Sequence, residues 1–357
     1  MTLADIAHER LHNQHLAAPV FERPADEVSW QGAMQSQDYY AAQWALGQRL
    51  AGATDAAVDA AFATGEILRT HVLRPTWHFV VPADIRWMLA LTAPRIKAAS
   101  LPYHRRLELD ERLLRRTNAL LAKALRDGAQ LTRDELRTVL ERAGISAADT
   151  VRMSFIMMHA ELDAVICSGA RRGKQFTYAL LEERAPQAAV LKRDEALAEL
   201  VLRFFRSHGP ATANDFAKWS GLTVADGERG LRDVERHLER ETAHGRTWWR
   251  GDSRPAVKRG SRTAYLLPNY DEYVVGYRHH DVVASPHLGT RTIFSNIIVL
   301  DGRVAGTWKR TLKRDGVLLE PGYFEPPGRT VAASVRAAAR RYGQFLELPV
   351  ELRSAEE

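Results

Sequence analysis

The stretch Leu131-Thr132-Arg133-Asp134-Glu135-Leu136 opens the part of the chain whose pattern decides the predicted fold. Thr132 and Glu135 have the spacing of a capping box, in which each side chain bonds the other residue's backbone N–H at a helix start. Gly144 is placed to end this helix. A second helix is expected over residues 147–161, where a methionine-rich face is typical of a core. The stretch therefore predicts two helices joined by a short turn.

A β-hairpin is expected directly after these helices, over residues 164–179. Its turn is rich in basic residues, and guanidinium groups suit planar contact with phosphate. The predicted phosphate contacts of this turn are Arg171, Arg172 and Lys174.

The same order of elements recurs further along the chain. Ala211-Thr212-Ala213-Asn214-Asp215-Phe216 again places a threonine three residues before an acid, and Gly221 again follows the helix. A recognition-type helix is expected over residues 224–238, followed by a long hairpin over residues 246–262. The predicted phosphate contacts of this hairpin are Arg246, Arg250, Lys258, Arg259 and Arg262.

The N-terminal part of the chain gives another copy of the pattern. Helices are expected over residues 41–50 and 54–64, and two strands within residues 67–81 meet at Pro75. A unit of two or three helices followed by a hairpin matches a helix-turn-helix with a β-wing. Three copies in one chain predict an α+β fold, mainly helical, built of tandem winged-helix units with a C-terminal β-hairpin and helix.

Two residues in the first hairpin are candidates for contact with an anionic partner. Arg74 precedes a proline in an extended segment, where phosphate contact is favoured over a surface ion pair. His78 either contacts phosphate or lies in the core beside Trp77, and the sequence leaves both alternatives open.

The expected domain boundaries follow from these repeats. The predicted parts are a first winged-helix unit over residues 1–85, a helical connector over 86–128, a second unit over 129–190, a third over 191–266, and a C-terminal region over 267–357. A hairpin turning at Asp301-Gly302 and a final helix over residues 330–346 are expected in that last region.

Composition restricts the class of protein. The 357 residues carry a net charge of +6, which favours an anionic partner, and the single cysteine, Cys167, is expected to be buried and inert. No apolar run approaches transmembrane length, and the N-terminus lacks the features of a signal peptide, so a cytoplasmic protein is expected.

His8 and His12 lack a third ligand nearby, and no phosphate-binding loop, dinucleotide fingerprint or zinc spacing is present. We therefore predict neither metal nor cofactor.

The stretch Met34-Gln35-Ser36-Gln37-Asp38-Tyr39-Tyr40 is the candidate for chemistry. In an extended segment, side chains two residues apart point the same way, so Gln35 and Gln37 can reach one small site. Ser36 and Asp38 are good helix caps, which places the pair at the mouth of a helix. Two amides can hold and orient a water molecule. On the pattern alone, a solvated polar helix start is the alternative, and it is the commoner case for so short a motif.

Several stretches together resemble the AlkZ/YcaQ-type winged-helix DNA glycosylases. The resemblance covers nearly the whole chain and rests on the order and spacing of Gln35-Ser36-Gln37, Leu73-Arg74-Pro75-Thr76-Trp77-His78, Ser168 to Tyr178, Gly209-Pro210-Ala211, Leu267-Pro268 through Tyr273, and Asp301-Gly302-Arg303-Val304-Ala305-Gly306-Thr307-Trp308.

This resemblance implies three winged-helix units around a channel for double-stranded DNA. It also implies hydrolysis of the N-glycosidic bond of alkylated purines, without metal or cofactor. The functional motif of the family falls on Gln35 and Gln37, which corresponds to the Gln-x-Gln branch; Ser36 stands where the family usually has an apolar residue. The basic residues identified above become predicted DNA contacts, and a monomer associated with the nucleoid is expected.

The chemistry of the residues agrees with the reaction that the resemblance implies. Alkylation at N7 or N3 places a positive charge on a purine, which makes the base a good leaving group, and the sugar passes through an oxocarbenium-like state. Positioning a water is then sufficient. Gln37 is expected to hold the water, and Gln35 to share it or to steady the developing cation, while Asp38 is expected to cap the helix.

Two function classes remain open from the sequence. The first is a glycosylase acting on alkylated DNA, and the second is a non-catalytic winged-helix protein that regulates transcription or binds DNA structurally. Asp271 and Glu272 lie between tyrosines and are expected to organise a loop or to hold an arginine rather than to act as paired acid and base.

Overall fold

The computed structural model describes residues 1–251, 263–284 and 294–353. The chain divides into two units. Unit 1 contains Met1–Asp59, Ala198–Trp219 and Thr223–Glu357, and unit 2 contains Ala60–Leu197 and Ser220–Leu222. Helices are more extensive than strands in the part described, and the predicted α+β class is confirmed.

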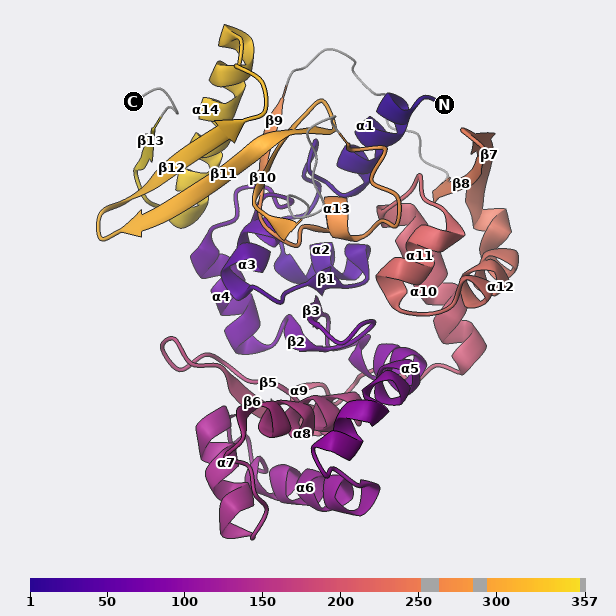
Figure 1. Ribbon diagram of the computed structural model, residues 1–357, viewed down its shortest axis with the longest axis vertical. Helices are drawn as coiled ribbons and strands as arrows, with labels where there is room; N and C mark the ends of the chain where they lie inside the picture. Colours follow the sequence, from indigo (N-terminus) through magenta and orange to yellow (C-terminus); the bar gives the residue numbers. More distant parts are fainter. Residues whose placement is uncertain (252–262, 285–293, 354–357) are drawn as a thin grey trace. The chain divides into compact units, whose positions relative to one another are not determined.

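The second predicted repeat forms one end of unit 2 (Figure 1). Its elements run in the order α6 (Glu111–Ala124), β4 (Leu131–Thr132), α7 (Arg133–Arg142), α8 (Thr150–Leu162), β5 (Ile166–Ser168) and β6 (Thr177–Leu180). Both halves of the capping box at Thr132 and Glu135 are present at the start of α7. The three strands form an antiparallel sheet in the order β4-β6-β5.

The region predicted as a helical connector consists of two helices, α5 (Ile85–Arg106) and α6. Leu114 and Leu121 of α6 share one buried core with Leu136 of α7 and Met153 of α8. The helix α6 therefore packs with the second repeat across the predicted boundary at residue 128. The short helix α9 (Leu181–Arg184) follows β6.

The third repeat has the same order of elements. It contains α10 (Arg193–Ser207), α11 (Ala213–Ser220), α12 (Val224–Val234), a 3₁₀ turn (Glu235–His237), β7 (Leu238–Ala243) and β8 (Arg246–Gly251). Ala211 forms a single antiparallel bridge with Trp249 of β8, in the place of the short first strand. The hairpin turns at His244 and Gly245 and begins at Leu238, earlier than the predicted start at residue 246.

The first repeat consists of α2 (Pro24–Gln31), β1 (Met34–Gln35), α3 (Tyr39–Gly47), α4 (Asp55–Thr64), β2 (Leu68–His71) and β3 (Trp77–Val80). β2 and β3 pair antiparallel on either side of Pro75, as predicted. The helix α1 (Leu3–Asn13) precedes this repeat, and it is shorter than the helix over residues 1–22 that the sequence predicts, because His15 adopts a left-handed conformation with φ of 55°.

The C-terminal part of unit 1 is a five-stranded sheet with a long helix beside it (Figure 1). Its strands are β9 (Ala264–Leu267), β10 (Ile297–Leu300), β11 (Arg303–Lys313), β12 (Gly316–Tyr323) and β13 (Val350–Leu352), in the order β13-β12-β11-β10-β9. The predicted turn at Asp301-Gly302 joins β10 to β11, and the final helix is α14 (Arg329–Leu346). Strands β9, β12 and β13 were not predicted.

The core of unit 1 joins α1 to this sheet. Ile6 and Leu11 of α1 belong to one buried cluster with Leu267, Ile297 and Val304. Burying a large aliphatic side chain is worth roughly 1.5–3 kcal/mol, so this cluster fixes the N-terminal helix on the sheet.

Two predictions from composition concern the single cysteine and membrane-spanning segments. Cys167 is fully buried, and burial raises the pKa of its thiol to about 12, which agrees with an inert cysteine. Among the described residues, no helix is long and apolar enough to cross a membrane.

Candidate active site

The stretch Met34–Gln37 lies in unit 1 and consists of β1 and the two residues that follow it. Its burial alternates, because Met34 and Ser36 are buried while Gln35 is half-buried and Gln37 is exposed. Asp38 then caps α3, and its carboxylate accepts from the Ala41 backbone N–H at 3.1 Å. The expected cap is therefore present, and a single site shared by the amides of Gln35 and Gln37 stays a prediction.

The other two repeats lack the two residues that form this extension. In repeats 2 and 3, the strand residue is followed directly by the helix cap, as in Leu131-Thr132 and Ala211-Thr212. In repeat 1, Ser36 and Gln37 are inserted between the end of β1 and the cap. The motif is therefore a local expansion of the repeated unit.

A buried carboxylate holds the backbone of the motif. Gln35 donates its backbone N–H to Glu272 Oε1 at 2.7 Å. Glu272 Oε2 accepts from Trp219 Nε1 at 3.1 Å and lies 3.6 Å from His208 Nε2. Glu272 is 1% exposed, and it begins the short helix α13 (Glu272–Val275). This role of Glu272 was missed in the sequence, because the two residues are 237 positions apart.

The neighbouring carboxylate has a different partner. Asp271 receives two hydrogen bonds from the Arg49 guanidinium, at 2.7 and 2.9 Å, and it caps α13. Arg49 also donates to Gln14 Oε1 at 2.9 Å. Burial opposes the charge of Arg49, but the carboxylates of Asp271, Glu27 and Glu272 together outweigh burial and raise the pKa of the guanidinium. The expectation that Asp271 holds an arginine is confirmed.

A second loop contact ties the cap of α3 to the C-terminal sheet. Asn269 donates its side-chain amide to Asp38 Oδ2 at 3.4 Å, and its backbone N–H to Asn296 Oδ1 at 2.9 Å. Trp44 of α3 donates its indole N–H to the Leu266 carbonyl oxygen at 2.6 Å. The end of β9 and the loop after it therefore support both ends of the motif.

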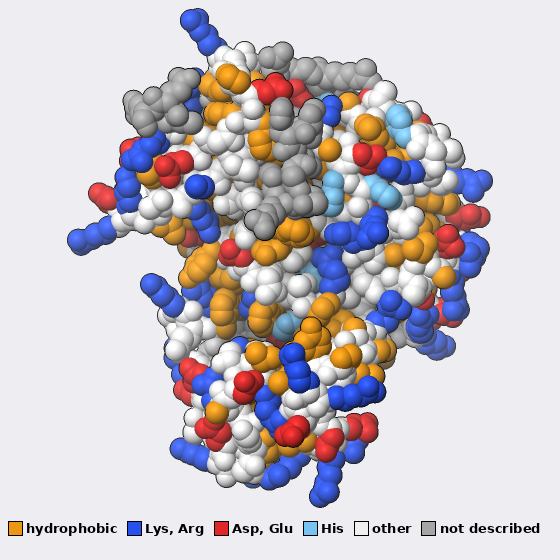
Figure 2. All heavy atoms as spheres, in the orientation of Figure 1, with side chains coloured by type: hydrophobic (Ala, Val, Ile, Leu, Met, Phe, Trp, Pro, Cys, Tyr) orange, Lys and Arg blue, Asp and Glu red, His pale blue; other side chains and the backbone are white. Residues whose placement is uncertain are grey.

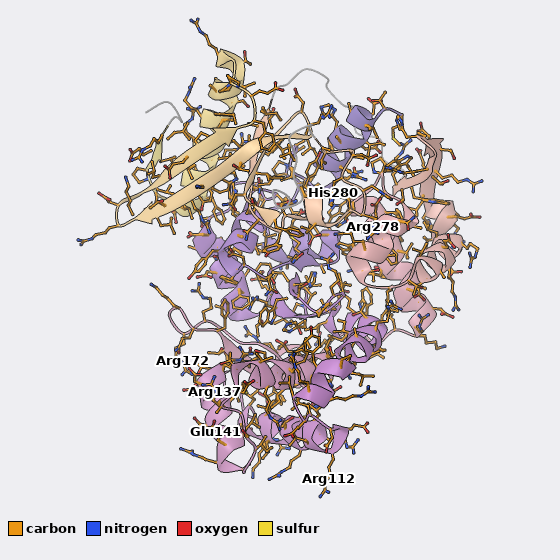
Figure 3. All side chains as sticks on the ribbon, viewed as in Figure 1. Arg112, Arg137, Glu141, Arg172, Arg278 and His280 are labelled. Carbon is orange, nitrogen blue, oxygen red and sulfur yellow. The ribbon has the colours of Figure 1, made fainter. Side chains whose placement is uncertain are left out.

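Five of the predicted DNA-contact residues lie at or near the surface. Arg172 and Lys174 are exposed in the loop between β5 and β6, and Figure 3 shows Arg172 there. Arg172 bonds Glu135 at 2.7 Å, and Arg171 and Arg74 are half-buried. Arg246 is partly exposed and pairs with Asp281 at 2.9 Å. Lys258, Arg259 and Arg262 lie outside the described residues.

The structure does not support two of the predicted contacts. His78 is buried, with Nδ1 2.9 Å from the Thr76 carbonyl oxygen and Nε2 3.3 Å from Arg74 Nη2, so the core alternative applies. Arg250 is 5% exposed and lies between the carboxylates of Glu9, Glu239 and Glu241. A guanidinium held in this way stabilises unit 1 and does not reach a phosphate.

The hairpin of β11 and β12 is basic and was missed in the sequence. Lys309, Lys313 and Arg314 are exposed near its turn, and Arg310 contacts Tyr342. The signal in the sequence was Lys309-Arg310-Thr311-Leu312-Lys313-Arg314, which has four basic residues in six. Figure 2 shows a different pattern at the end of unit 2 with α6 and α7, where basic and acidic side chains are interspersed.

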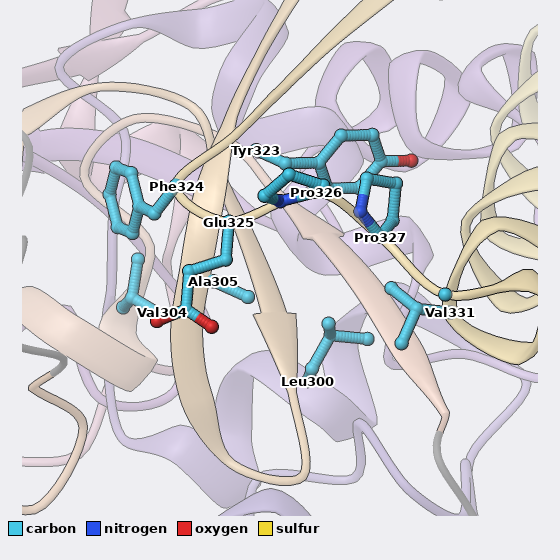
Figure 4. A pocket seen from close by; sticks show the side chains of 10 residues that line it. Leu300, Val304, Ala305, Tyr323, Phe324, Glu325, Pro326, Pro327 and Val331 are labelled. Carbon is cyan, nitrogen blue, oxygen red and sulfur yellow. The ribbon is translucent and has the colours of Figure 1, made fainter.

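The pocket drawn in Figure 4 is lined by none of the site residues described above. It has a volume of about 240 Å³ and contains Tyr323, Phe324, Pro326, Pro327 and Val331 among its lining residues. None of its lining residues was a candidate for chemistry. The described part of the chain contains no group of three or more His, Cys, Asp or Glu residues that could hold a metal ion.

The buried His208 makes the stability of unit 1 depend on pH. Its ring is fully buried and stacks on Phe204 at 4.8 Å. Burial lowers the pKa of His208 from 6.5, and Glu272 opposes this only in part. As the pH falls, His208 binds a proton more readily in the unfolded chain than in the folded chain. The free energy of unfolding therefore decreases as the pH falls below about 6.5.

We expect the free energy of unfolding, measured in denaturant between pH 7 and 5, to fall less steeply in His208→Gln than in the wild type. His244→Gln, in the exposed turn of β7 and β8, is the matched control and keeps the wild-type slope. The same pH dependence in His208→Gln and the wild type would show that His208 is not the group responsible.

Comparison with known proteins gives the class to which this fold and site belong. The sequence profile of the family described as DNA glycosylase AlkZ-like matches residues 28–345. The chain belongs to this family, whose members are named as DNA glycosylases, hydrolases of N-glycosyl bonds. The resemblance predicted from the sequence is thereby confirmed.

Two comparisons with Streptomyces sahachiroi proteins agree with this membership. The chain is 25% identical over 364 residues to an interstrand DNA cross-link repair glycosylase, covering 96% of this chain and 97% of the relative. It also matches the solved structure of DNA glycosylase AlkZ with a TM-score of 0.81 and 21% identity, covering 99% of this chain and 100% of that one. The structural match shows a shared fold.

Proposed function

We propose that this protein hydrolyses the N-glycosidic bond of purines that carry a positive charge from alkylation at N7 or N3. The observation that supports the proposal most directly is the motif. Gln35 and Gln37 are the two less buried residues of the stretch Met34–Gln37, whose backbone is held at Gln35 by Glu272. This segment is an expansion that the other two repeats lack.

Two amides in this arrangement can position a water molecule but cannot activate it strongly. A side-chain amide offers one acceptor oxygen and two donor hydrogens, and it neither gains nor loses a proton near neutral pH. Gln37 would hold the attacking water, and the carbonyl oxygen of Gln35 would share it or face the positive charge that develops on the sugar. A cationic base leaves with its bonding electrons and becomes neutral, so no acid is needed.

We also propose that the three repeats are winged-helix units that contact the DNA backbone. The order helix, short strand, two helices and two strands is common to all three repeats. The helix that would enter a groove is unsuited to phosphate in two of them. In repeat 1, α4 carries Asp55 and Asp59 and no basic residue. In repeat 2, α8 has Phe155 stacked on Tyr103 of α5 at 5.0 Å, and Arg152 bonds the Leu107 carbonyl.

The backbone contacts therefore fall to the β-hairpins, namely the turn with Arg171, Arg172 and Lys174 and the turn with Lys309, Lys313 and Arg314. Each phosphate neutralised by a protein cation releases counterions, so binding weakens with salt. Contacts of this kind do not read sequence. This suits an enzyme that must find a damaged base in any sequence.

Replacing both Arg172 and Lys174 by alanine tests this assignment. We expect the slope of log affinity against log salt to fall by about 1 to 2 units, because up to two phosphate contacts are lost. Arg112→Ala with Arg115→Ala is the matched control, since it removes the same charge from the mixed-charge helix α6, where Figure 3 labels Arg112. Equal slopes for the two double variants would show that the β5–β6 turn does not contact DNA.

The proposed activity can be tested without choosing a lesion in advance. Duplex DNA is treated with a methylating agent, incubated with the purified protein, and the released bases are identified by mass spectrometry. We expect 7-methylguanine and 3-methyladenine above the level released by heat-inactivated protein. Tight binding without any released base would instead support a non-catalytic DNA-binding protein.

Three further features belong to the same proposal. The relative in Streptomyces sahachiroi is named for interstrand cross-link repair, and a crosslink through alkylated purines presents the same cationic leaving group. We propose that such crosslinks are unhooked by this chain. Three DNA-binding units in one chain also favour a monomer, and double-stranded DNA as substrate favours association with the nucleoid.

A further inference from the structure

Glu272 is a buried carboxylate, far from the motif in sequence, that bonds the backbone of Gln35. Its two oxygens accept from the Gln35 backbone N–H at 2.7 Å and from Trp219 Nε1 at 3.1 Å. We propose that Glu272 is a positioning residue, which fixes the backbone of Gln35 and thereby sets where the two amides stand. This inference rests on the proposed function, and it names a residue for the same site.

The carboxylate is itself held from several sides. Because Glu272 is 1% exposed, its charge must be compensated by donors rather than by water. Hydrogen bonds to an ionised acceptor are about twice as strong as those between neutral groups. The backbone at position 272 is fixed in turn, because Asp271 caps α13 and is bonded twice to the buried Arg49. Glu272 is therefore a rigid anchor for Gln35.

An anchor matters here because the strand that carries Gln35 is short. Gln35 ends a strand of two residues, and two further residues precede the cap of α3. Neutral amides contribute to the reaction mainly by positioning the water. Displacing such a group by about 1 Å can lower the rate roughly 100-fold. Removing the acceptor for the Gln35 N–H should therefore lower the rate of the chemical step more than the affinity for DNA.

The test compares two substitutions of Glu272 in single-turnover reactions on a duplex with one 7-methylguanine. Glu272→Ala is expected to lower the rate at saturating protein by about 100-fold, with the dissociation constant for DNA within about twofold of the wild type. Glu272→Gln is expected to recover to within about tenfold of the wild type, because its amide oxygen still accepts from Gln35.

Glu9→Gln is the matched control. Glu9 is a buried carboxylate of the same unit, but its ion-pair partner is Arg250, at 3.4 Å. Assayed below its melting temperature, this variant should lose thermal stability while its rate stays within about threefold of the wild type. Amide hydrogen exchange gives a readout independent of activity: exchange at Gln35 should accelerate in Glu272→Ala and remain slow in Glu9→Gln.

Three outcomes would overturn the positioning role. One is equal exchange at Gln35 in Glu272→Ala and the wild type. Another is a fall in rate in Glu9→Gln as large as that in Glu272→Ala, which would indicate general damage to the fold. The third is a rate for Glu272→Gln as low as that for Glu272→Ala, which would assign the effect to charge. A wild type that releases no base would refute the proposed function, while the exchange measurement still decides whether Glu272 holds Gln35.

Discussion

Gln37→Ala is expected to lower the single-turnover release of 7-methylguanine by at least about 100-fold, which corresponds to about 2.7 kcal/mol in the barrier. The physical reason is that Gln37 is the exposed member of the pair and is assigned to hold the water. Its side chain is not buried, so the loss of a few methylene groups should leave the fold intact. Affinity for DNA should stay within about twofold, because no charge is removed.

Two further variants test whether the effect depends on the amide of Gln37. Gln344→Ala removes an exposed glutamine from α14 and should behave as the wild type in both rate and affinity. Gln37→Asn keeps the amide but draws it back by one methylene, and it should remain well below the wild type if placement matters. Wild-type rates in Gln37→Ala would remove Gln37 from the reaction.

The second large effect concerns the lesion rather than the protein. Duplexes with 7-methylguanine or 3-methyladenine should be processed, while those with uracil, ethenoadenine or 8-oxoguanine should not. Help from a general acid or base is typically worth roughly 100- to 10,000-fold, and neutral Gln35 and Gln37 cannot give it. A base that already carries a positive charge does not require that help.

The structure adds one point to this argument. The carboxylate that bonds the backbone of the motif, Glu272, accepts from Gln35 and from the indole of Trp219, so both of its oxygens are engaged. The selectivity is measured in parallel single-turnover reactions on otherwise identical duplexes. Uracil or ethenoadenine released as fast as 7-methylguanine would mean that a true acid or base operates, and Asp38 would be the first residue to substitute.

Much of the local structure could be predicted from the sequence, because caps and turns depend on neighbouring residues. Thr132 and Glu135 form the expected capping box, and Asp301-Gly302 form the expected turn. The alternating burial of Met34 to Gln37 agrees with the two-residue period expected there. These features need no knowledge of contacts made by distant parts of the chain.

The features that were missed depend on contacts far apart in the sequence. Arg250 looks like a surface cation in its own segment, but Glu9 and Glu239 enclose it. Likewise, Glu272 shows its contact with the motif only after folding brings it to Gln35. Strand β12 was missed because its pairing with the exposed, charged end of β11 leaves no alternating apolar pattern there.

The most direct test of the central claim counts both products of one reaction. A duplex with a single 7-methylguanine is incubated with excess protein and a metal chelator, and free base and abasic sites are measured in the same tube over time. The account predicts one free 7-methylguanine for each abasic site, an intact strand until alkali is added, and neither product with Gln37→Ala. Binding without base release, or strand cleavage in step with base release, would contradict it.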